Sequence, residues 1–227
     1  MAVIGGLDPA VTDGLTFTID AANTRSYPGS GTSWFDIVGS NNPTVAGAPT
    51  FSTDNFGIFA FDGTDDQFSV EVQLLFPDPE NFTIEYFINI FASNGNQLYG
   101  TFSNSKRLYH GIYNGYWDIG YGGTAWDTSS NTNKQALTDG WNHVTMTATG
   151  GTVKIYINGV ANTRTITDTT GFSYTSGDPY LIGAWGNPTR NATYSKVNKL
   201  SYFRVYNRGL TASEVTQNYN VLKYRFQ

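Results

Sequence analysis

The sequence has no cysteine in its 227 residues, and charged side chains make up only 14% of it. Without cysteine, disulfides and thiolate metal sites are excluded, so packing must stabilise the fold, as suits assembly in a reducing cytoplasm. Lys and Arg number 13 against 18 Asp and Glu, with no basic run. Because clustered cations are needed to bind a phosphate backbone, we expect no nucleic-acid partner.

Long apolar segments are missing too. The chain begins M-A-V-I-G-G-L-D-P, with no basic start and no continuous apolar core, and its first cation is Arg25. A secretory signal needs both features, and a membrane-spanning helix needs about 20 apolar residues in succession. The sequence therefore predicts neither a secretory signal nor a membrane anchor.

Catalytic groups are scarce. Only His110 and His143 offer an imidazole, the motif G-x-S-x-G is absent, and no glutamates show the E-x-D-x-x-E spacing of sandwich-fold glucanases. His143, in W-N-H-V, is expected to be a structural hydrogen-bonding residue. A glycoside hydrolase needs two carboxylates across a cleft, and Asp118 and Asp127 are the best remaining pair. We expect no enzymatic activity.

What the chain does have is aromatic residues, 15% of the total, and 25 glycines. Apolar and polar residues alternate in many short segments, such as G-L-T-F-T-I-D, as in half-buried strands. The alternation predicts strands near residues 15–20, 68–72, 82–90, 144–148, 153–157, 180–184 and 199–207. Gly150-Gly151 and Asn158-Gly159 predict tight turns within a meander. The fold class is therefore all-β, a sandwich or a barrel.

One segment has a helical pattern instead. In G-L-T-A-S-E-V-T-Q-N-Y-N-V-L, residues 209–222, Thr211 and Glu214 have the spacing of a capping box, and apolar residues follow at helical intervals. This predicts one short amphipathic helix lying on the sandwich. No linker or composition shift divides the chain, so we expect an N-terminal arm, residues 1–13, and one domain, residues 14–227.

Three carboxylates lie close together in F-D-G-T-D-D-Q-F, residues 61–68. Asp65 and Asp66 are adjacent, so on a strand they would point to opposite faces and could not act as a catalytic pair. The Asp62-Gly63 pair favours a turn between two strands. We expect this turn and no required cofactor, with a calcium ion held by these oxygens as the open alternative.

Aromatic residues gather in R-L-Y-H-G-I-Y-N-G-Y-W-D-I-G-Y-G-G-T-A-W-D, residues 107–127. Flat rings among glycines and amides are typical of a surface that stacks on sugars. The candidate glycan-binding residues are Tyr113, Trp117, Tyr121 and Trp126. The alternative is that part of these rings belongs to the core.

Several segments follow one another in the order of a known family: G-L-T-F-T-I-D-A-A-N-T-R-S-Y-P-G-S-G-T-S-W-F-D-I-V-G-S-N-N, F-D-G-T-D-D-Q-F, W-N-H-V, K-I-Y-I-N-G-V and F-R-V-Y-N-R-G-L-T-A-S-E-V-T-Q-N-Y-N. They resemble the laminin-G-like, concanavalin A-like lectin/glucanase domains, most closely those of tailed-phage structural proteins. The resemblance implies a two-sheet antiparallel jelly-roll sandwich whose C-terminal helix closes one edge.

The resemblance also implies a function. It points to a non-enzymatic virion structural protein of a tailed phage, on the capsid or attached to a tail or fibre. Such a protein is assembled in the host cytoplasm and has other virion proteins, or further copies of itself, as partners. The arm, residues 1–13, and the tail, residues 221–227, are then expected to make subunit contacts. The alternative is a lectin-like adhesion module that binds a host surface polysaccharide, because the family includes lectins, hydrolases and architectural modules.

Overall fold

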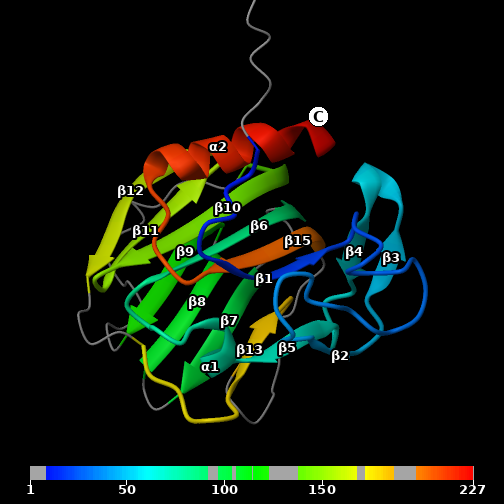
Figure 1. Ribbon diagram of the computed structural model, residues 1–227, viewed down its shortest axis with the longest axis horizontal. Coiled ribbons are helices and arrows are strands. Elements are labelled where there is room, and N and C mark those ends of the chain that lie inside the picture. The colour runs from blue at the N-terminus through cyan, green and yellow to red at the C-terminus, as the bar shows by residue number, and fades with distance from the viewer. Residues whose placement is uncertain are drawn as a thin grey trace, which may run out of the picture.

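The computed structural model describes residues 9–91, 97–103, 106–113, 115–122, 138–167, 172–186 and 198–226. These residues form two β-sheets packed face to face (Figure 1). The predicted all-β jelly-roll sandwich of the concanavalin A type is confirmed. Its C-terminal helix, α2 (Ala212–Leu222), does not close an edge as the resemblance implied but lies on the outer face of one sheet, where Leu222 packs with Phe87 and Tyr202. No helix in the described ranges is long and apolar enough to span a membrane.

The first sheet has eight strands. Their order is β12 (Val160–Thr167), β11 (Thr152–Ile157), β10 (Gly140–Thr149), β6 (Phe82–Ile90), β15 (Asn198–Tyr206), β4 (Ile58–Phe61) and β3 (Thr50–Ser52), and β1 (Leu15–Asp20) pairs with β15. Strand β15 pairs with β6 along one edge and with β4 and β1 along the other. It therefore joins the meander β6–β10–β11–β12 to the N-terminal strands.

The second sheet has seven strands. Their order is β2 (Thr44–Ala46), β5 (Gln67–Glu71), β13 (Pro179–Ile182), β7 (Gln97–Ser103), β8 (Lys106–Tyr113) and β9 (Tyr116–Gly122), and β14 (Trp185–Gly186) pairs with β7 in parallel. A single helical turn, α1 (Val72–Leu75), follows β5. The alternation did not predict α1, β2, β3 or β14, because elements this short carry no measurable periodicity. The longer strands β7, β8, β9 and β12 were not predicted either, although β8 and β9 overlap the aromatic segment 107–127.

Alternating apolar residues of the predicted strands form the core between the sheets. In β6, Ile84 and Tyr86 face inward, and Val144 and Met146 of β10 lie beside them, all at most 1% exposed. The hairpin turns are also as predicted: Asn158 has a φ of 53° and Gly159 a φ of 78°. Local patterns therefore specify the central meander.

A histidine lies inside this core. His110 of β8 is fully buried, its Nδ1 lies 2.7 Å from the Tyr86 hydroxyl oxygen, and its Nε2 forms a hydrogen bond with the Tyr180 hydroxyl. Burial lowers the pKa of His110 to about 3. A neutral imidazole has one N–H donor and one bare nitrogen, so it can serve both hydroxyl groups without a buried charge.

Acid is expected to destabilise the domain through His110. In the unfolded chain this side chain binds a proton below a pKa of about 6.5, whereas in the folded domain it stays neutral down to about pH 3. The contribution of neutral His110 to the free energy of unfolding is complete above pH 6.5. It falls as the pH is lowered, by about 2–3 kcal/mol at pH 4.5. Urea unfolding of the wild type and of His110→Gln at pH 7 and pH 4.5 measures the difference. Equal losses in the two proteins would exclude His110 as the cause.

The outer face of the first sheet carries a buried carboxylate beneath α2. Glu85 Oε1 accepts a hydrogen bond from the Tyr202 hydroxyl at 2.9 Å, and Oε2 accepts one from Asn218 Nδ2 of α2 at 2.5 Å. His143 Nε2 lies 3.3 Å from Oε1, and Arg204 Nη1 lies 3.7 Å from it. Burial opposes the charge, but His143, Arg204 and Asn218 outweigh it and lower the pKa of Glu85 to about 2. His143 is fully buried beside this carboxylate, as a structural residue would be, but neither of its ring nitrogens has a hydrogen-bond partner in the described part of the chain, so the hydrogen bonding predicted for it is not found there.

Helix α2 begins at the predicted capping box. The Thr211 hydroxyl oxygen accepts the backbone N–H of Glu214 at 3.3 Å, and the Glu214 carboxylate accepts the backbone N–H of Thr211 at 2.8 Å. Arg208 pairs with Glu214 at 2.6 Å, and this contact lowers the pKa of Glu214 to about 2. The helix start is therefore fixed by local hydrogen bonds.

The described part of the N-terminal arm packs on its own domain. The backbone N–H of Val11 donates to Asn218 Oδ1 at 2.7 Å, and the Tyr206 hydroxyl donates to the Val11 carbonyl at 3.1 Å. Residues 1–8 and Gln227 lie outside the described residues. The subunit contacts expected of the arm and of the tail stay a prediction.

Candidate functional site

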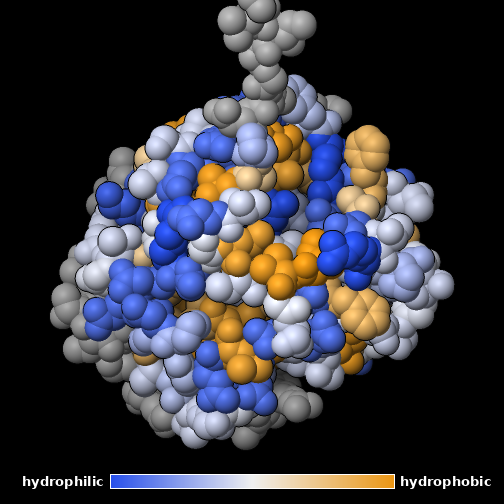
Figure 2. Space-filling view, viewed as in Figure 1, coloured by the Kyte–Doolittle hydropathy of each residue, from blue (hydrophilic) through white to orange (hydrophobic). Residues whose placement is uncertain are grey.

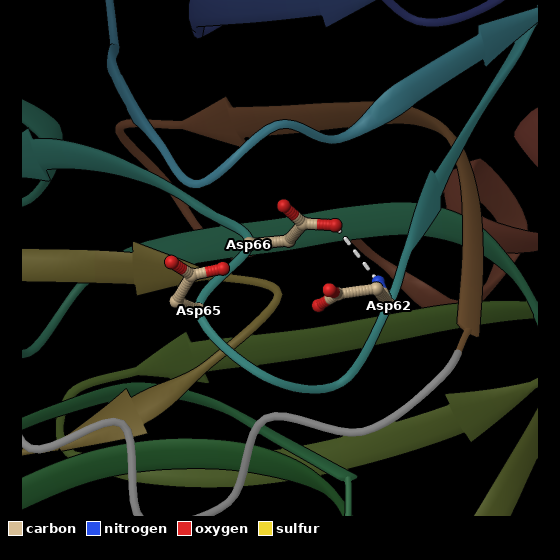
Figure 3. Close-up of side chains that lie close together, drawn as sticks. All are labelled: Asp62, Asp65 and Asp66. Carbon is tan, nitrogen blue, oxygen red and sulfur yellow. Dashed lines mark hydrogen bonds between the residues drawn. The ribbon is translucent and has the colours of Figure 1, made fainter.

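The three-aspartate turn joins β4 to β5, as its Asp-Gly sequence predicts. Asp66 is 3% exposed, whereas Asp62 and Asp65 are exposed. Asp66 Oδ2 accepts the backbone N–H of Asp62 at 2.8 Å, and Asp66 Oδ1 accepts that of Ala48 at 2.6 Å. Figure 3 shows the three side chains facing one small space inside the turn. The buried aspartate organises the turn, and the other two present their carboxylates to solvent.

Asp66 is also held by close backbone packing from the loop after β2. Gly47 has a φ of 69°, and a Cβ at this position would lie 2.4 Å from Asp66 Oδ1 and 2.8 Å from Asp66 N. Only glycine combines this backbone conformation with so close an approach. The Asp-Gly turn and the Gly47 loop are thereby fixed against each other.

An open cleft of about 800 Å³ lies beside this turn. Its lining consists of Gly47, Ala48, Thr50, Ala60, Phe61, Asp62, Asp65 and Asp66. The aspartates supply oxygens from the β4–β5 turn, and small side chains of the β3–β4 hairpin and the Gly47 loop supply the walls. A wall made mostly of small residues, with carboxylates beside it, leaves room for a ligand to approach the charged groups.

The carboxylates beside the cleft are suited to two kinds of ligand, a calcium ion and a hydroxyl group. Oxygens of Asp62, Asp65 and Asp66 lie within 4.8 Å of one another, and such oxygens are ligands that calcium takes. Exposed carboxylates also accept hydrogen bonds from ligand hydroxyl groups. Both oxygens of Asp66 accept backbone N–H groups, and Asp62 Oδ1 accepts that of Thr64 at 2.7 Å, so Asp62 Oδ2 and the Asp65 carboxylate carry most of the remaining capacity. None of the ion pairs between described residues involves these three aspartates.

The family follows from a match over more than half of the chain. Residues 62–216, from the aspartate turn into α2, match the family described as the Concanavalin A-like lectin/glucanases superfamily. The chain belongs to this superfamily. Among curated proteins, the search finds no match to the sequence.

Solved structures with the same fold include binding domains of toxins. The binding domain of botulinum neurotoxin DC in complex with SialylT is 16% identical with a TM-score of 0.66, and the alignment covers 93% of this chain and 52% of that one. The binding domain of paraclostridial mosquitocidal protein 1 is 16% identical with a TM-score of 0.64, covering 92% of this chain and 52% of that one. At this identity the likeness shows the fold alone.

An enzyme contains the fold as well. Trypanosoma rangeli sialidase in complex with sialic acid is 15% identical with a TM-score of 0.64, and the alignment covers 96% of this chain and 34% of that one. This concanavalin A-like chain therefore spans about half of the toxin domains and a third of the sialidase. Activities of the longer proteins do not transfer with the fold.

The predicted aromatic platform of this concanavalin A-like domain is largely inside the core. Trp117 is 1% exposed and Tyr121 is 0% exposed, and both belong to the core between the sheets, so neither can stack on a sugar. The prediction for these two residues is corrected, because Trp117, Ile119 and Tyr121 share the inward face of β9. The side chain of Tyr113 and all of Trp126 lie outside the described residues.

The carboxylate pair considered for hydrolysis is not assembled in the described residues. Asp118 is 2% exposed, and its Oδ1 accepts its neighbour's backbone N–H, that of Ile119, at 2.9 Å. Asp127 lies outside the described residues. The turn aspartates were found from sequence, but the walls of their cleft were not, since Gly47 and Ala48 come from a separate loop with no local signal linking it to Asp66.

Proposed function

We propose that this domain is a non-enzymatic carbohydrate-binding module whose cleft holds a neutral oligosaccharide. The observation that carries the proposal is the open cleft rimmed by the exposed carboxylates of Asp62 and Asp65. Sugar hydroxyls donate to carboxylates in charge-assisted hydrogen bonds, and the small walls at Ala48 and Ala60 leave space for a ring. The superfamily, and structures of its fold in complex with SialylT and with sialic acid, support the ligand class.

The charge of the cleft bears on which sugar it accepts. A sialylated glycan carries a carboxylate of its own, and like charges at an interface oppose binding. No cation offsets Asp62 and Asp65 among the ion pairs of the described residues. We therefore expect uncharged sugars to bind more tightly than sialylated ones at this cleft, unless calcium lies between the carboxylates and the ligand.

Replacing both exposed aspartates is expected to weaken glycan binding at least tenfold. Each charged hydrogen bond is worth about 1.5–3 kcal/mol, so the double variant Asp62→Asn/Asp65→Asn loses more than the roughly 1.4 kcal/mol of one decade. The measurement is a glycan array of neutral and sialylated oligosaccharides, followed by titration calorimetry with the best binder. Repeating it with calcium and with a chelator tests the calcium prediction.

The matched control is Glu71→Gln. Glu71 is an exposed acid at the end of β5 that does not line the cleft, so its loss changes net charge without touching the site. If the double variant bound the glycan as tightly as the wild type does, this would contradict the placement of the sugar in this cleft. A wild type that binds no glycan on the array would contradict the proposed function itself.

A position on a phage particle stays a prediction from the sequence resemblance, as do the virion partners and assembly in a host cytoplasm. The solved structures named above are toxin binding domains and a sialidase, and their names do not bear on a virion. Glycan binding is the better supported reading, and it is compatible with attachment to a particle.

A further inference from the structure

A strained turn holds an aromatic ring in solvent at the end of the β3–β4 hairpin. In η1 (Asp54–Phe56), Asn55 has a φ of 49° and Phe56 a φ of 67°. Asparagine tolerates this left-handed conformation, but for a bulky side chain such as Phe it is a genuine outlier. Phe56 is nevertheless 75% exposed. The ring therefore gains little from burial that would offset the strain of its backbone.

Several contacts fix this turn. The backbone N–H of Gly57 donates to the Asp54 carbonyl at 2.8 Å, and the Ser201 hydroxyl donates to the Gly57 carbonyl at 3.2 Å. A Cβ at Gly57 would lie 2.2 Å from the Ala21 carbonyl oxygen, so the backbone is packed tightly against the segment after β1. The outward direction of Phe56 is built into the fold, and strain of this kind is characteristic of functional positions.

A second exposed ring stands on the neighbouring turn. Tyr224 is 58% exposed and lies in η4 (Lys223–Arg225), directly after α2. Asn55 Nδ2 donates to the Arg225 carbonyl at 2.8 Å, which ties the two turns together. Figure 1 shows the C-terminal end of the chain beside the top of the β3–β4 hairpin. Two aromatic side chains from distant parts of the sequence thus reach solvent from adjoining turns.

Polar residues lie near both rings. The Lys223 ammonium lies 5.6 Å from the centroid of the Tyr224 ring, and Asp54 and Asn55 precede Phe56 in the same turn. Figure 2 shows apolar patches of this face separated by hydrophilic ones rather than merged into one area. A stable protein partner needs about 800 Å² of buried surface on each side with a largely apolar centre. Two separate exposed rings, one with an ammonium group beside it and the other in a turn with Asp54 and Asn55, suit instead the apolar C–H face and the hydroxyl groups of a pyranose.

We propose that Phe56 and Tyr224 form a second carbohydrate contact, in which their rings stack on pyranose units while Lys223 and Asp54 bind hydroxyl groups. The inference rests on the proposed function and adds to it exposed aromatic rings, since Phe61, the aromatic residue in the cleft lining, is only 1% exposed. The nearest lining residue of the cleft along this strand is Ala60, four residues from Phe56, which is roughly 13 Å at the rise of a strand, and the exposed aspartates lie beyond it. The two sites lie at opposite ends of β4 and are separately testable.

The decisive variant is Phe56→Gly. Glycine adopts a φ near 67° without strain, so the variant removes the ring and relieves the backbone together. We expect the signal on an array of neutral and sialylated oligosaccharides to fall at least tenfold, with a melting temperature unchanged or raised by about 2–4 °C. Tyr224→Ala, which involves no strained residue, is expected to lower the same signal at an unchanged melting temperature.

Val160→Ala is the matched control, since Val160 is 67% exposed at the start of β12. One outcome would overturn this inference and leave the proposed function standing. In it, Phe56→Gly and Tyr224→Ala give the array signal of the wild type, whereas Asp62→Asn/Asp65→Asn loses the signal. A lowered melting temperature in Phe56→Gly would assign the ring a structural role and overturn it too. A wild type without signal on any glycan would overturn both.

Discussion

Replacing Glu85 by alanine is expected to lower the free energy of unfolding by about 3–5 kcal/mol, the cost of breaking a buried charge network from one side. Tyr202 and Asn218 donate hydrogen bonds to this carboxylate, and His143 Nε2 lies 3.3 Å from it. Arg204, whose guanidinium faces Glu85 at 3.7 Å, would lose this partner and keep its charge. Urea unfolding followed by circular dichroism measures the loss.

The loss is expected to appear first in α2. Asn218 belongs to that helix and is 0% exposed, so its amide would be left against an apolar gap where the carboxylate had been. Hydrogen exchange in Glu85→Ala should therefore speed up in residues 212–222 more than in the core strand β10. Uniform acceleration across the domain would show that the carboxylate supports the whole sandwich rather than the docking of this helix.

The control for this prediction is Glu71→Ala. Glu71 is exposed at the end of β5, and the only hydrogen bond of its side chain within the described residues comes from Gln73 Nε2. Surface substitutions of this kind change stability by at most about 0.5 kcal/mol. If Glu85→Ala and Glu71→Ala were equally stable, the buried network would make no net contribution.

Features set by neighbouring residues could be predicted from the sequence. The capping box at Thr211 and Glu214 predicts the start of α2, since both hydrogen bonds lie within four residues. The Asn158-Gly159 turn is predicted for the same reason, because its positive φ angles require these two residue types. Period-2 alternation then places the strands between such fixed points.

Features assembled from distant segments could not be predicted. The sequence shows Glu85 only as an acid between apolar neighbours, while its partners come from β10, β15 and α2. The wall of the aspartate cleft is non-local as well, since Ala48 lies 18 residues before Asp66. The left-handed backbone conformation of Phe56 could not be predicted for a different reason, because no sequence pattern indicates a phenylalanine in that conformation.

Replacing Trp117 by alanine is expected to destabilise the domain by about 3–5 kcal/mol, as truncation of a buried Trp leaves a large cavity. Its ring is 1% exposed and packs in the core between the sheets. A loss of this size corresponds to a fall in melting temperature of about 10 °C. The sequence alone allows the opposite outcome, in which the ring faces solvent and its loss removes glycan binding while stability is unchanged.

Thermal unfolding and the glycan array on the same Trp117→Ala sample separate these outcomes. We expect a large fall in melting temperature, with glycan binding retained below it, because the cleft at Asp62 and the rings of Phe56 and Tyr224 lie on other elements. Trp117→Phe is the graded control: it keeps most of the apolar volume, and the indole N–H it removes has no hydrogen-bond partner in the described part of the chain. Its loss of stability should therefore be the smaller of the two. If Trp117→Ala kept the full stability of the wild type and lost glycan binding, Trp117 would belong to the sugar site. This would contradict the buried position of its side chain on β9.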